Sequence, residues 1–283
     1  MAISEPSGAS AADNSALPLE GQVALVTGSG RGLGRTIAEK LLSLGANVVL
    51  HDINEEAPSR FGEAASLSAL AESMNDSSAA DVVAVVGDLT DEAAVKALVA
   101  AAENMLGPIS ILVNCAGGDV GANGDKPSPA TPTNFKVDDV LAVLGRNLIG
   151  TMLMCREVAP GMVDRKCGSI LTIGSILAHR GSTEEVGYAC AKAAVVHYTR
   201  SLASELRESG VRANVVSPGP TKTARFMATR ETDSKMDDSG PSLIRYASPA
   251  EIADAVSYFA GPDSRYISGQ VLLVDGGDGT YAC

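Results

Sequence analysis

The chain has 283 residues, of which 45% are hydrophobic and 20% are charged, a composition typical of a globular protein with one large α/β domain. Its 34 acidic and 22 basic residues give a formal net charge of −12, which would repel nucleic acids and anionic membrane surfaces, so neither is an expected partner. Five cysteines and three scattered histidines, without paired or metal-ligand spacing, predict neither disulfides nor a metal site and fit a reduced, cytoplasmic setting.

The start of the chain differs in composition from the rest. Residues 1–17 are rich in Ser, Ala and Pro and lack the basic region and apolar stretch of a signal peptide, so they predict a disordered tail. No run reaches the roughly 18 apolar residues that a membrane span needs. Residues 18–283 contain no internal linker or short repeat and are expected to form a single domain.

From residue 22 onward, short runs of Val, Ile and Leu alternate with segments of helical apolar spacing. Helices are expected at 35–45, 60–74, 91–106, 136–163, around Tyr188, and at 249–260. Strands are expected at 22–27, 46–52, 81–88, 109–117, 169–175, 211–219 and 269–275. Continuous apolar strands separated by helices require parallel pairing with right-handed crossovers. We therefore predict a Rossmann-type α/β fold: a doubly wound, seven-stranded parallel sheet with helices on both faces.

A glycine-rich turn lies between the first strand and the first helix. It has the pattern T-G-x-x-x-G-x-G, formed by Thr27, Gly28, Gly32 and Gly34, with Leu33 where the G-x-G-x-x-G pattern has its third glycine. Glycines there let the backbone approach a pyrophosphate, and the N-terminus of the following helix attracts its charge. The turn therefore predicts a dinucleotide site.

Asp52 ends the second strand about 20 residues further on, where a carboxylate that binds the ribose hydroxyls of NAD is expected. Its charge would repel the 2′-phosphate of NADP. Arg31, inside the glycine-rich turn, would attract that phosphate, or else contact the pyrophosphate or solvent. Giving Asp52 the greater weight, we expect NAD rather than NADP as the cofactor.

Tyr188 and Lys192 stand four residues apart in a segment of helical spacing, so their side chains should share one helix face. A neighbouring ammonium lowers the pKa of a phenol and makes it a usable acid or base. Ser175 is the last residue of the strand expected at 169–175 and is placed to hydrogen-bond a substrate oxygen. Taken alone, a Tyr-x-x-x-Lys pair is weak support for a catalytic site, and the chain provides further motifs.

Together, in this order, these features resemble the short-chain dehydrogenases/reductases, over roughly residues 19–277. Asp88 and Leu89 resemble the family's adenine-contacting pair. Asn114, Ala116 and Gly117 resemble its N-N-A-G motif, with Cys115 in place of the second Asn. Other matches are the nicotinamide-binding segment, with Pro218, Gly219, Thr221 and Thr223, and the closing strand around 267–277.

The resemblance also implies roles for four catalytic residues. Ser175 would hold the substrate oxygen, Tyr188 would exchange its proton, Lys192 would lower the Tyr pKa and bind the nicotinamide ribose, and Asn147 would position a proton-relaying water. Arg31 and Leu33 join the cofactor contacts through the glycine-rich motif. Hydride would pass between the nicotinamide and a secondary alcohol or ketone.

The substrate is a small molecule whose pocket we expect from the loop after residue 117 and from residues 220–248, a candidate lid. Both are polar, and the second carries Lys222, Arg225, Arg230, Lys235 and Arg245. A polyol, sugar or hydroxy acid is therefore favoured, although a solvated lid surface would carry the same charges. The alternatives are a reductase of the 3-oxoacyl-carrier-protein type and, from another class, a non-catalytic cofactor-binding sensor.

Assembly into a homotetramer or dimer is also implied by the resemblance. An apolar stretch at 195–203 is a candidate to pack against a symmetry-related copy. The alternative is that this stretch packs against the chain's own sheet.

Overall fold

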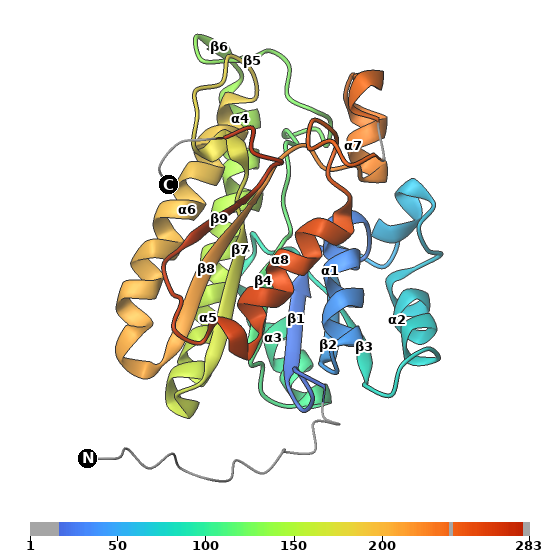
Figure 1. The fold of residues 1–283 in the computed structure, drawn as a ribbon, viewed down its shortest axis with the longest axis vertical. Coiled ribbons are helices and arrows are strands. Elements are labelled where there is room, and N and C mark those ends of the chain that lie inside the picture. Colours follow the sequence, from blue (N-terminus) through green and yellow to red (C-terminus); the bar gives the residue numbers. More distant parts are fainter. Residues whose placement is uncertain (1–16, 238–239, 280–283) are drawn as a thin grey trace, which may run out of the picture.

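The computed structural model describes residues 17–237 and 240–279, so nearly all of the predicted tail lies outside the described part of the chain (Figure 1). Seven strands form one sheet in the order β3-β2-β1-β4-β7-β8-β9, and every neighbouring pair is parallel. This confirms the predicted fold class. The strands are β1 (Val23–Thr27), β2 (Asn47–Asp52), β3 (Val82–Val86), β4 (Ile111–Asn114), β7 (Gly168–Ile173), β8 (Val211–Pro218) and β9 (Val271–Val274).

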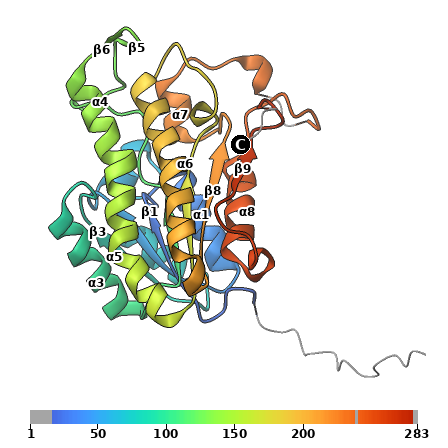
Figure 2. The same cartoon turned by 90° about the vertical axis from the view of Figure 1, so that its left-hand side faces the viewer.

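Helices cover both faces of this sheet, because the strands present apolar side chains alternately to each side. In β1, Ala24 and Val26 join one core cluster while Val23 and Leu25 join the other. The first cluster is completed by α1 (Gly32–Ser43), α2 (Leu67–Asn75) and α8 (Pro249–Ala260). The second is completed by α3 (Glu92–Leu106), α5 (Gly150–Arg165) and α6 (Val186–Leu206). Helices α5 and α6 lie in front of the strands in Figure 2.

The strand order reverses between β1 and β4, which pair directly although two strands separate them in the sequence. In such sheets the loops that follow these two strands run in opposite directions, and a crevice that can hold a ligand lies between them. The glycine-rich turn after β1 and the loop after β4 both begin there.

Two expected helices are divided in the structure. The segment predicted at 60–74 forms a 3-10 turn, η1 (Ala57–Phe61), and then α2, which begins after Ser66 because its hydroxyl accepts from the Ala69 N–H at 3.0 Å. The helix predicted at 136–163 consists of α4 (Val137–Leu144), a π-helical turn (Gly145–Ile149) and α5. Such π turns inside helices occur frequently at functional sites.

Two segments lie beyond the carboxyl ends of the strands, at the top of Figure 1. One follows β4 and contains a small antiparallel hairpin, β5 (Ala130–Thr131) and β6 (Asn134–Phe135), that the sequence pattern did not predict. The other, the candidate lid at 220–248, contains α7 (Ala224–Thr229) and a 3-10 turn at Ser234–Met236.

The apolar stretch at 195–203 packs inside its own chain. Val195, Val196 and Leu202 of α6 are all buried, and Leu202 belongs to the core on that face of the sheet. Exposed apolar side chains lie instead on α4 and α5, including Leu141 and Met152.

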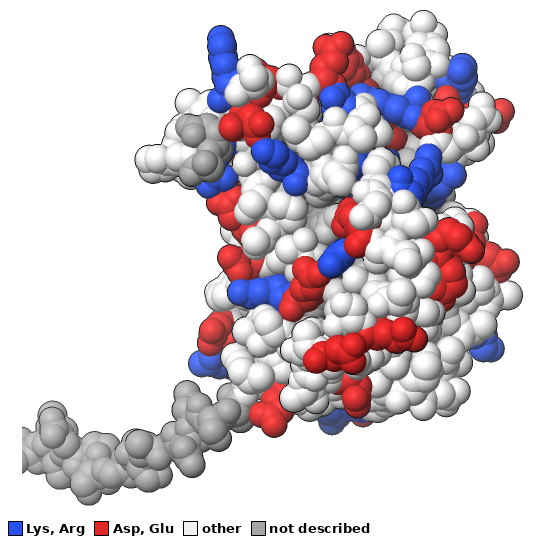
Figure 3. All heavy atoms as spheres, turned by 90° about the vertical axis from the view of Figure 1, so that its right-hand side faces the viewer, with Lys and Arg blue, Asp and Glu red and all other residues white. Residues whose placement is uncertain are grey.

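The surface carries both kinds of charge. Acidic and basic side chains are intermixed over the face drawn in Figure 3. Within the described residues, no helix combines the length and the apolar character that crossing a membrane requires.

Candidate active site

A cavity of about 810 Å³ opens at the carboxyl ends of the central strands. It is lined by the glycine-rich turn, the ends of β2, β3, β7 and β8, the loop after β4, the first turns of α6, and α7. Most of the residues that the sequence singled out therefore meet around one space. Those that line it are Gly28, Arg31, Gly32, Leu33, Gly34, Asp52, Asp88, Leu89, Ala116, Gly117, Ser175, Tyr188, Lys192, Pro218, Gly219, Thr221 and Thr223.

The glycine-rich turn packs too closely on its neighbours to hold side chains at two positions. A Cβ on Gly28 would lie 2.8 Å from the Cα of Ala116, and one on Gly34 would lie 2.2 Å from the Gly28 carbonyl oxygen. Helix α1 starts directly after Arg31, whose side chain makes no capping bond. The turn thus brings backbone and a helix N-terminus to the cavity wall, as binding of a pyrophosphate requires.

His51 holds this turn against the end of β2. Its Nδ1 accepts from the Gly28 N–H at 3.3 Å, and its Nε2 lies 3.0 Å from the Gly87 carbonyl oxygen, so the ring is neutral with its proton on Nε2. Burial lowers the pKa of His51, which favours this neutral form. Sequence reasoning missed His51, because a lone histidine in a strand gives no signal of its contacts.

Asp52 and Arg31 stand at the same end of the cavity. Asp52 is buried and accepts from the Ile53 N–H at 2.8 Å. The Arg31 guanidinium donates to the Ala57 carbonyl oxygen at 3.0 Å and lies 5.1 Å from the centre of the Phe61 ring. The segment after β2 therefore binds the side chain of Arg31, the cation of the glycine-rich turn.

Glu63 adds a second carboxylate to this region, and sequence reasoning also missed it. It accepts from the Gly32 N–H at 2.8 Å, at the N-terminus of α1, and it lines the cavity. Asp88 and Leu89, at the end of β3, complete the wall, with Asp88 accepting from both the N–H and the hydroxyl of Thr90.

Thr27 and Asn114 were expected to contact the cofactor, but neither lines the cavity. The Thr27 hydroxyl accepts from the N–H groups of Cys115 and Ala116, each at 3.0 Å, and so fixes the loop after β4 to β1. Asn114 is buried behind the wall, where its amide donates to the Cys155 sulfur at 3.4 Å. In this structure both residues support the cavity wall and do not face the cavity.

Tyr188 and Lys192 project from the first turns of α6 into the cavity, as their spacing predicts. The Lys192 Nζ lies 5.6 Å from the centre of the Tyr188 ring and donates to the Ile173 carbonyl oxygen at 2.7 Å. Burial lowers the pKa of Lys192 to about 8. Ser175 follows β7 and forms a side-chain hydrogen bond with Tyr188, so three of the four expected catalytic residues converge.

The pKa of Tyr188 moves in the direction opposite to the one expected from the sequence. Burial raises it to about 12, while the Arg230 guanidinium and the bond with Ser175 act the other way. The reason is that removing water disfavours the phenolate more strongly than the nearby positive charges favour it.

Asn147, the fourth expected catalytic residue, lies in the π-helical turn and is buried outside the cavity lining. Its side chain accepts from the Gly118 N–H and donates to the Gly118 carbonyl oxygen, both at 2.9 Å, and it also donates to the Val143 carbonyl oxygen at 2.8 Å. These contacts fix the loop after β4. They leave the Asn147 amide engaged with backbone.

The nicotinamide segment expected after β8 lies along the cavity. A Cβ on Gly219 would lie 2.9 Å from the Cα of Asp275, and the Thr221 hydroxyl donates to the Gly219 carbonyl oxygen at 2.9 Å. The Thr223 hydroxyl caps α7 by accepting from the Phe226 N–H. This segment therefore links the cofactor side of the cavity to the candidate lid.

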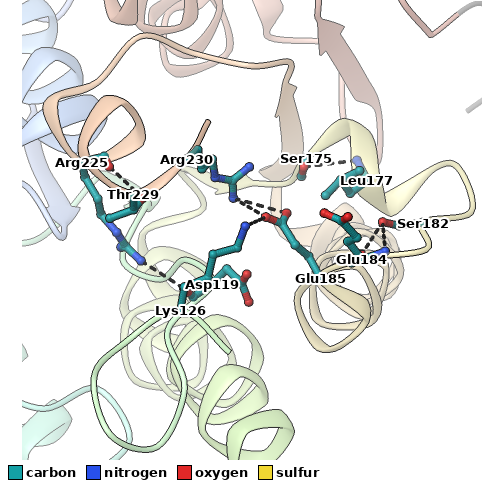
Figure 4. A network of polar contacts seen from close by, with 10 residues as sticks. All are labelled: Asp119, Lys126, Ser175, Leu177, Ser182, Glu184, Glu185, Arg225, Thr229 and Arg230. Carbon is teal, nitrogen blue, oxygen red and sulfur yellow. Dashed lines mark hydrogen bonds and ion pairs between the residues drawn. The ribbon is translucent and has the colours of Figure 1, made fainter. Parts of the chain in front are cut away.

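A charged network on the substrate side was not predicted as a unit (Figure 4). Glu185, at the start of α6, pairs with Lys126 at 2.9 Å and with Arg230 at 3.1 Å. Arg225 donates to backbone carbonyl oxygens of Gly117 and Asp119 in the loop after β4. Three segments distant in sequence are thereby joined in the wall of the cavity that Tyr188 also lines.

The other lid cations have different positions. Arg245 forms a bidentate pair with Glu251, and Lys222 pairs with Asp237; neither Arg245 nor Lys222 lines the cavity. Of the five lid cations seen in the sequence, Arg225 and Arg230 line it.

The residues on the cofactor side fit a nicotinamide dinucleotide. At Gly28 and Gly34 a Cβ would collide with backbone, a helix N-terminus faces the cavity, and Asp52 lines it at the end of β2, where a ribose-binding carboxylate is expected. When bound, such a cofactor supplies hydride chemistry.

Comparison with known proteins agrees with the resemblance to the short-chain dehydrogenases/reductases. A family model described as "Enoyl-(Acyl carrier protein) reductase", which belongs to the short-chain dehydrogenase/reductase family, matches residues 28–278. The chain is 33% identical over 265 residues to the 2,3-dihydroxy-2,3-dihydro-p-cumate dehydrogenase of Pseudomonas putida, covering 93% of this chain and 96% of that protein. It is 33% identical over 263 residues to the 3-oxoacyl-acyl-carrier-protein reductase FabG of Vibrio harveyi, covering 92% and 98%.

A solved structure assigned as a gluconate dehydrogenase of Agrobacterium tumefaciens superposes with a TM-score of 0.80 at 26% identity, over 93% of this chain and 98% of that one. The fold, the ordered motifs and these relatives agree. The chain therefore belongs to the short-chain dehydrogenase/reductase family and is an NAD(P)-dependent oxidoreductase acting on CH–OH groups.

Proposed function

We propose that this enzyme interconverts a small, polar secondary alcohol and its ketone, the alcohol being a polyol, a sugar or a hydroxy acid. The observation that carries this proposal is the charged lining of the substrate side, where Asp119, Lys126, Glu185, Arg225 and Arg230 surround the approach to Tyr188. A site with buried polar groups binds substrates that hydrogen-bond to those groups and rejects bare hydrocarbon, which leaves them unpaired.

The chain's own groups divide the work of the reaction. Ser175 and Tyr188 hold the substrate oxygen between their hydroxyls, and Tyr188 gives that oxygen a proton in ketone reduction or removes one in alcohol oxidation. Lys192 keeps its ammonium beside the Tyr188 ring through its bond to the Ile173 carbonyl oxygen. Asn147 acts as a positioning residue, because its amide fixes Gly118 in the loop that borders the substrate.

The preferred cofactor in this proposal is NAD(H). Asp52 and Glu63 both line the adenosine end of the cavity, and each would repel a 2′-phosphate. The cation that would attract that phosphate, Arg31, is engaged by Ala57 and Phe61. Because Asp52 and Glu63 would repel the 2′-phosphate and Arg31 is already bound by other groups, the site favours the cofactor whose ribose has no 2′-phosphate.

The alternative within the family is reduction of a 3-oxoacyl thioester, and the Vibrio harveyi relative supports it. That relative is as similar to this chain as the dihydrodiol dehydrogenase of Pseudomonas putida, so identity does not separate the two. The substrate side favours the polar alcohol, because a long acyl chain would have to pass the paired charges of Glu185, Lys126 and Arg230. A non-catalytic sensor is disfavoured by the convergence of Ser175, Tyr188 and Lys192.

A substrate panel tests this proposal. The purified enzyme is assayed by NADH absorbance with polyols, sugar alcohols, hydroxy acids, steroid alcohols and, in the reverse direction, an acetoacetyl thioester. We expect the highest kcat/KM among the small polar alcohols. A higher kcat/KM for the thioester than for every polar alcohol would replace this function by the acyl-reductase alternative. No turnover with any compound of the panel, together with intact NADH binding, would support the sensor.

Three further assignments belong to the same proposal. Residues 18–283 act as a single catalytic domain, in which 220–248 is the lid over the substrate. The lid assignment is supported by the ion pair that joins Arg230, directly after α7, to Glu185 of α6. A homodimer or homotetramer is supported by the exposed apolar side chains of α4 and α5.

A further inference from the structure

The loop after β4 places a carboxyl group in the substrate side of the cavity without a partner for one of its oxygens. Asp119 is only 7% exposed, and it lines the cavity together with Tyr188. Its Oδ2 has no hydrogen-bond partner among the described residues. A buried carboxyl oxygen without a donor is costly, and such groups in native proteins generally have a specific function.

The cations near Asp119 are committed to other groups. Lys126 and Arg230 pair with Glu185 at 2.9 and 3.1 Å. Arg225 directs its guanidinium at the backbone carbonyl oxygens of Gly117 and Asp119. In Figure 4 the Asp119 carboxyl points away from that guanidinium and toward the side on which Glu185 lies.

The charge around Asp119 determines which kind of ligand group suits it. Glu185 is a second carboxylate close by, and burial together with Glu185 raises the pKa of Asp119 to about 6, although Lys126, Arg230 and Arg225 act in the opposite direction. A substrate carboxylate has no donor to offer and would add a third negative group. A substrate hydroxyl donates a hydrogen bond and carries no charge, so it meets the requirement of the site.

Asp119 shares the cavity with the expected catalytic residues Ser175 and Tyr188. Asp119 and Tyr188 line the same cavity, and the Asp119 charge acts on the Tyr188 phenol. A substrate that places one oxygen at Ser175 and Tyr188 therefore lies in the same cavity as the Asp119 carboxyl.

We propose that Asp119 is a specificity-determining residue that accepts a hydrogen bond from a second hydroxyl of the substrate, so that the preferred substrates are diols or higher polyols. This inference rests on the proposed function and narrows it, because among polar alcohols it selects those with a free hydroxyl beside the reacting CH–OH group. It assigns no such role to a carboxylate.

Two alcohols that differ by one hydroxyl test the inference. The quantity measured is the ratio of kcat/KM for cis-cyclohexane-1,2-diol to that for cyclohexanol, with NAD⁺ as oxidant. A hydrogen bond to a buried charged group corresponds to roughly 10- to 100-fold, so we expect a wild-type ratio of at least about ten. Asp119→Ala should lower the ratio at least about tenfold, and Asp119→Asn, which keeps the shape but loses the charge, should give an intermediate value.

Asp138→Asn is the matched control, since it removes one carboxylate from an exposed position of α4 that does not line the cavity. Its ratio should equal that of the wild type, and NADH binding verifies that each variant is folded. A ratio that Asp119→Ala leaves unchanged would overturn the inference while the proposed function stands. A wild-type enzyme that oxidises sugars or hydroxy acids but no diol or polyol would also overturn the inference alone. One that oxidises no polyol, sugar or hydroxy acid, with NADH bound normally, would overturn the proposed function and the inference with it.

Discussion

Gly34→Ala separates the effect of close packing from the effect of helix propensity at the cofactor turn. Gly34 lies in the first turn of α1, where alanine is intrinsically the better helix former by about 1 kcal/mol. A methyl group at this position would lie 2.2 Å from the Gly28 carbonyl oxygen, 2.8 Å from the Gly28 carbonyl carbon and 3.0 Å from the Ser29 Cα. All three atoms belong to the backbone, so no side-chain rotation relieves the contacts.

The steric term should exceed the propensity term. Relief requires α1 and the turn to separate by roughly 1 Å, at the upper end of the range of about 1–3 kcal/mol for overpacking. Subtracting the gain in helix propensity leaves a net destabilisation of about 2 kcal/mol, which for a domain of this size lowers Tm by about 4–8 °C. The same displacement moves the pyrophosphate cradle, so the Kd for NADH should rise at least about tenfold.

Thermal unfolding and NADH fluorescence titration measure the two effects. The control is Gly161→Ala in α5, where the nearest atom to an added Cβ is the flexible Arg165 Nη1 at 3.1 Å. That variant should gain about 0.5–1 kcal/mol and bind NADH normally. If Gly34→Ala also raised Tm and kept its NADH affinity within about twofold, the close approach of α1 to the turn would be refuted.

Four other outcomes are expected. Tyr188→Phe should abolish turnover with NADH affinity retained, and more than about a tenth of the activity left in the variant would exclude this role. Because the pKa of Tyr188 is raised to about 12, the wild type should reduce ketones at a nearly constant rate below about pH 8, where Lys192 keeps its charge, and alcohol oxidation should become faster as pH rises toward that value. Asp52→Ser should shift the NADPH-to-NADH affinity ratio toward NADPH, and tighter wild-type binding of NADPH would contradict the NAD assignment. Arg225→Glu should raise KM for the best polar substrate at least about tenfold, whereas Arg245→Glu should mainly lower Tm by breaking the pair with Glu251. Equal effects of the two variants on KM would refute the placement of Arg225, and not of Arg245, at the cavity. Light scattering should give a multiple of 28.8 kDa at micromolar concentration, and a monomer mass would exclude the oligomer.

The sequence by itself determined the sheet and most of the cofactor side. Seven continuous apolar runs separated by helices permit little except a parallel sheet covered on both faces, and the structure has that sheet. The glycine-rich turn, Asp52 and the Tyr188–Lys192 pair were recognisable because each depends on a short, fixed spacing within one element or at one strand end.

The tertiary structure decided which of these residues face the cavity and which support it. Thr27 and Asn114 belong to the recognisable motifs, yet packing turns both behind the wall. Burial also reversed the expected direction of the Tyr188 pKa, because desolvation depends on everything that surrounds the ring and the neighbour four residues away is only one part of that.

The substrate side was decided by the tertiary structure alone. Asp119 and Lys126 come from the loop after β4, Glu185 from the start of α6, and Arg225 and Arg230 from the candidate lid. No periodicity or motif links positions so far apart in the chain, and charges in polar loops look the same in sequence whether they are solvated or paired. Only the packing of the loops over the carboxyl ends of the strands shows that Glu185 pairs with two of the cations and that one Asp119 oxygen has no hydrogen-bond partner among the described residues.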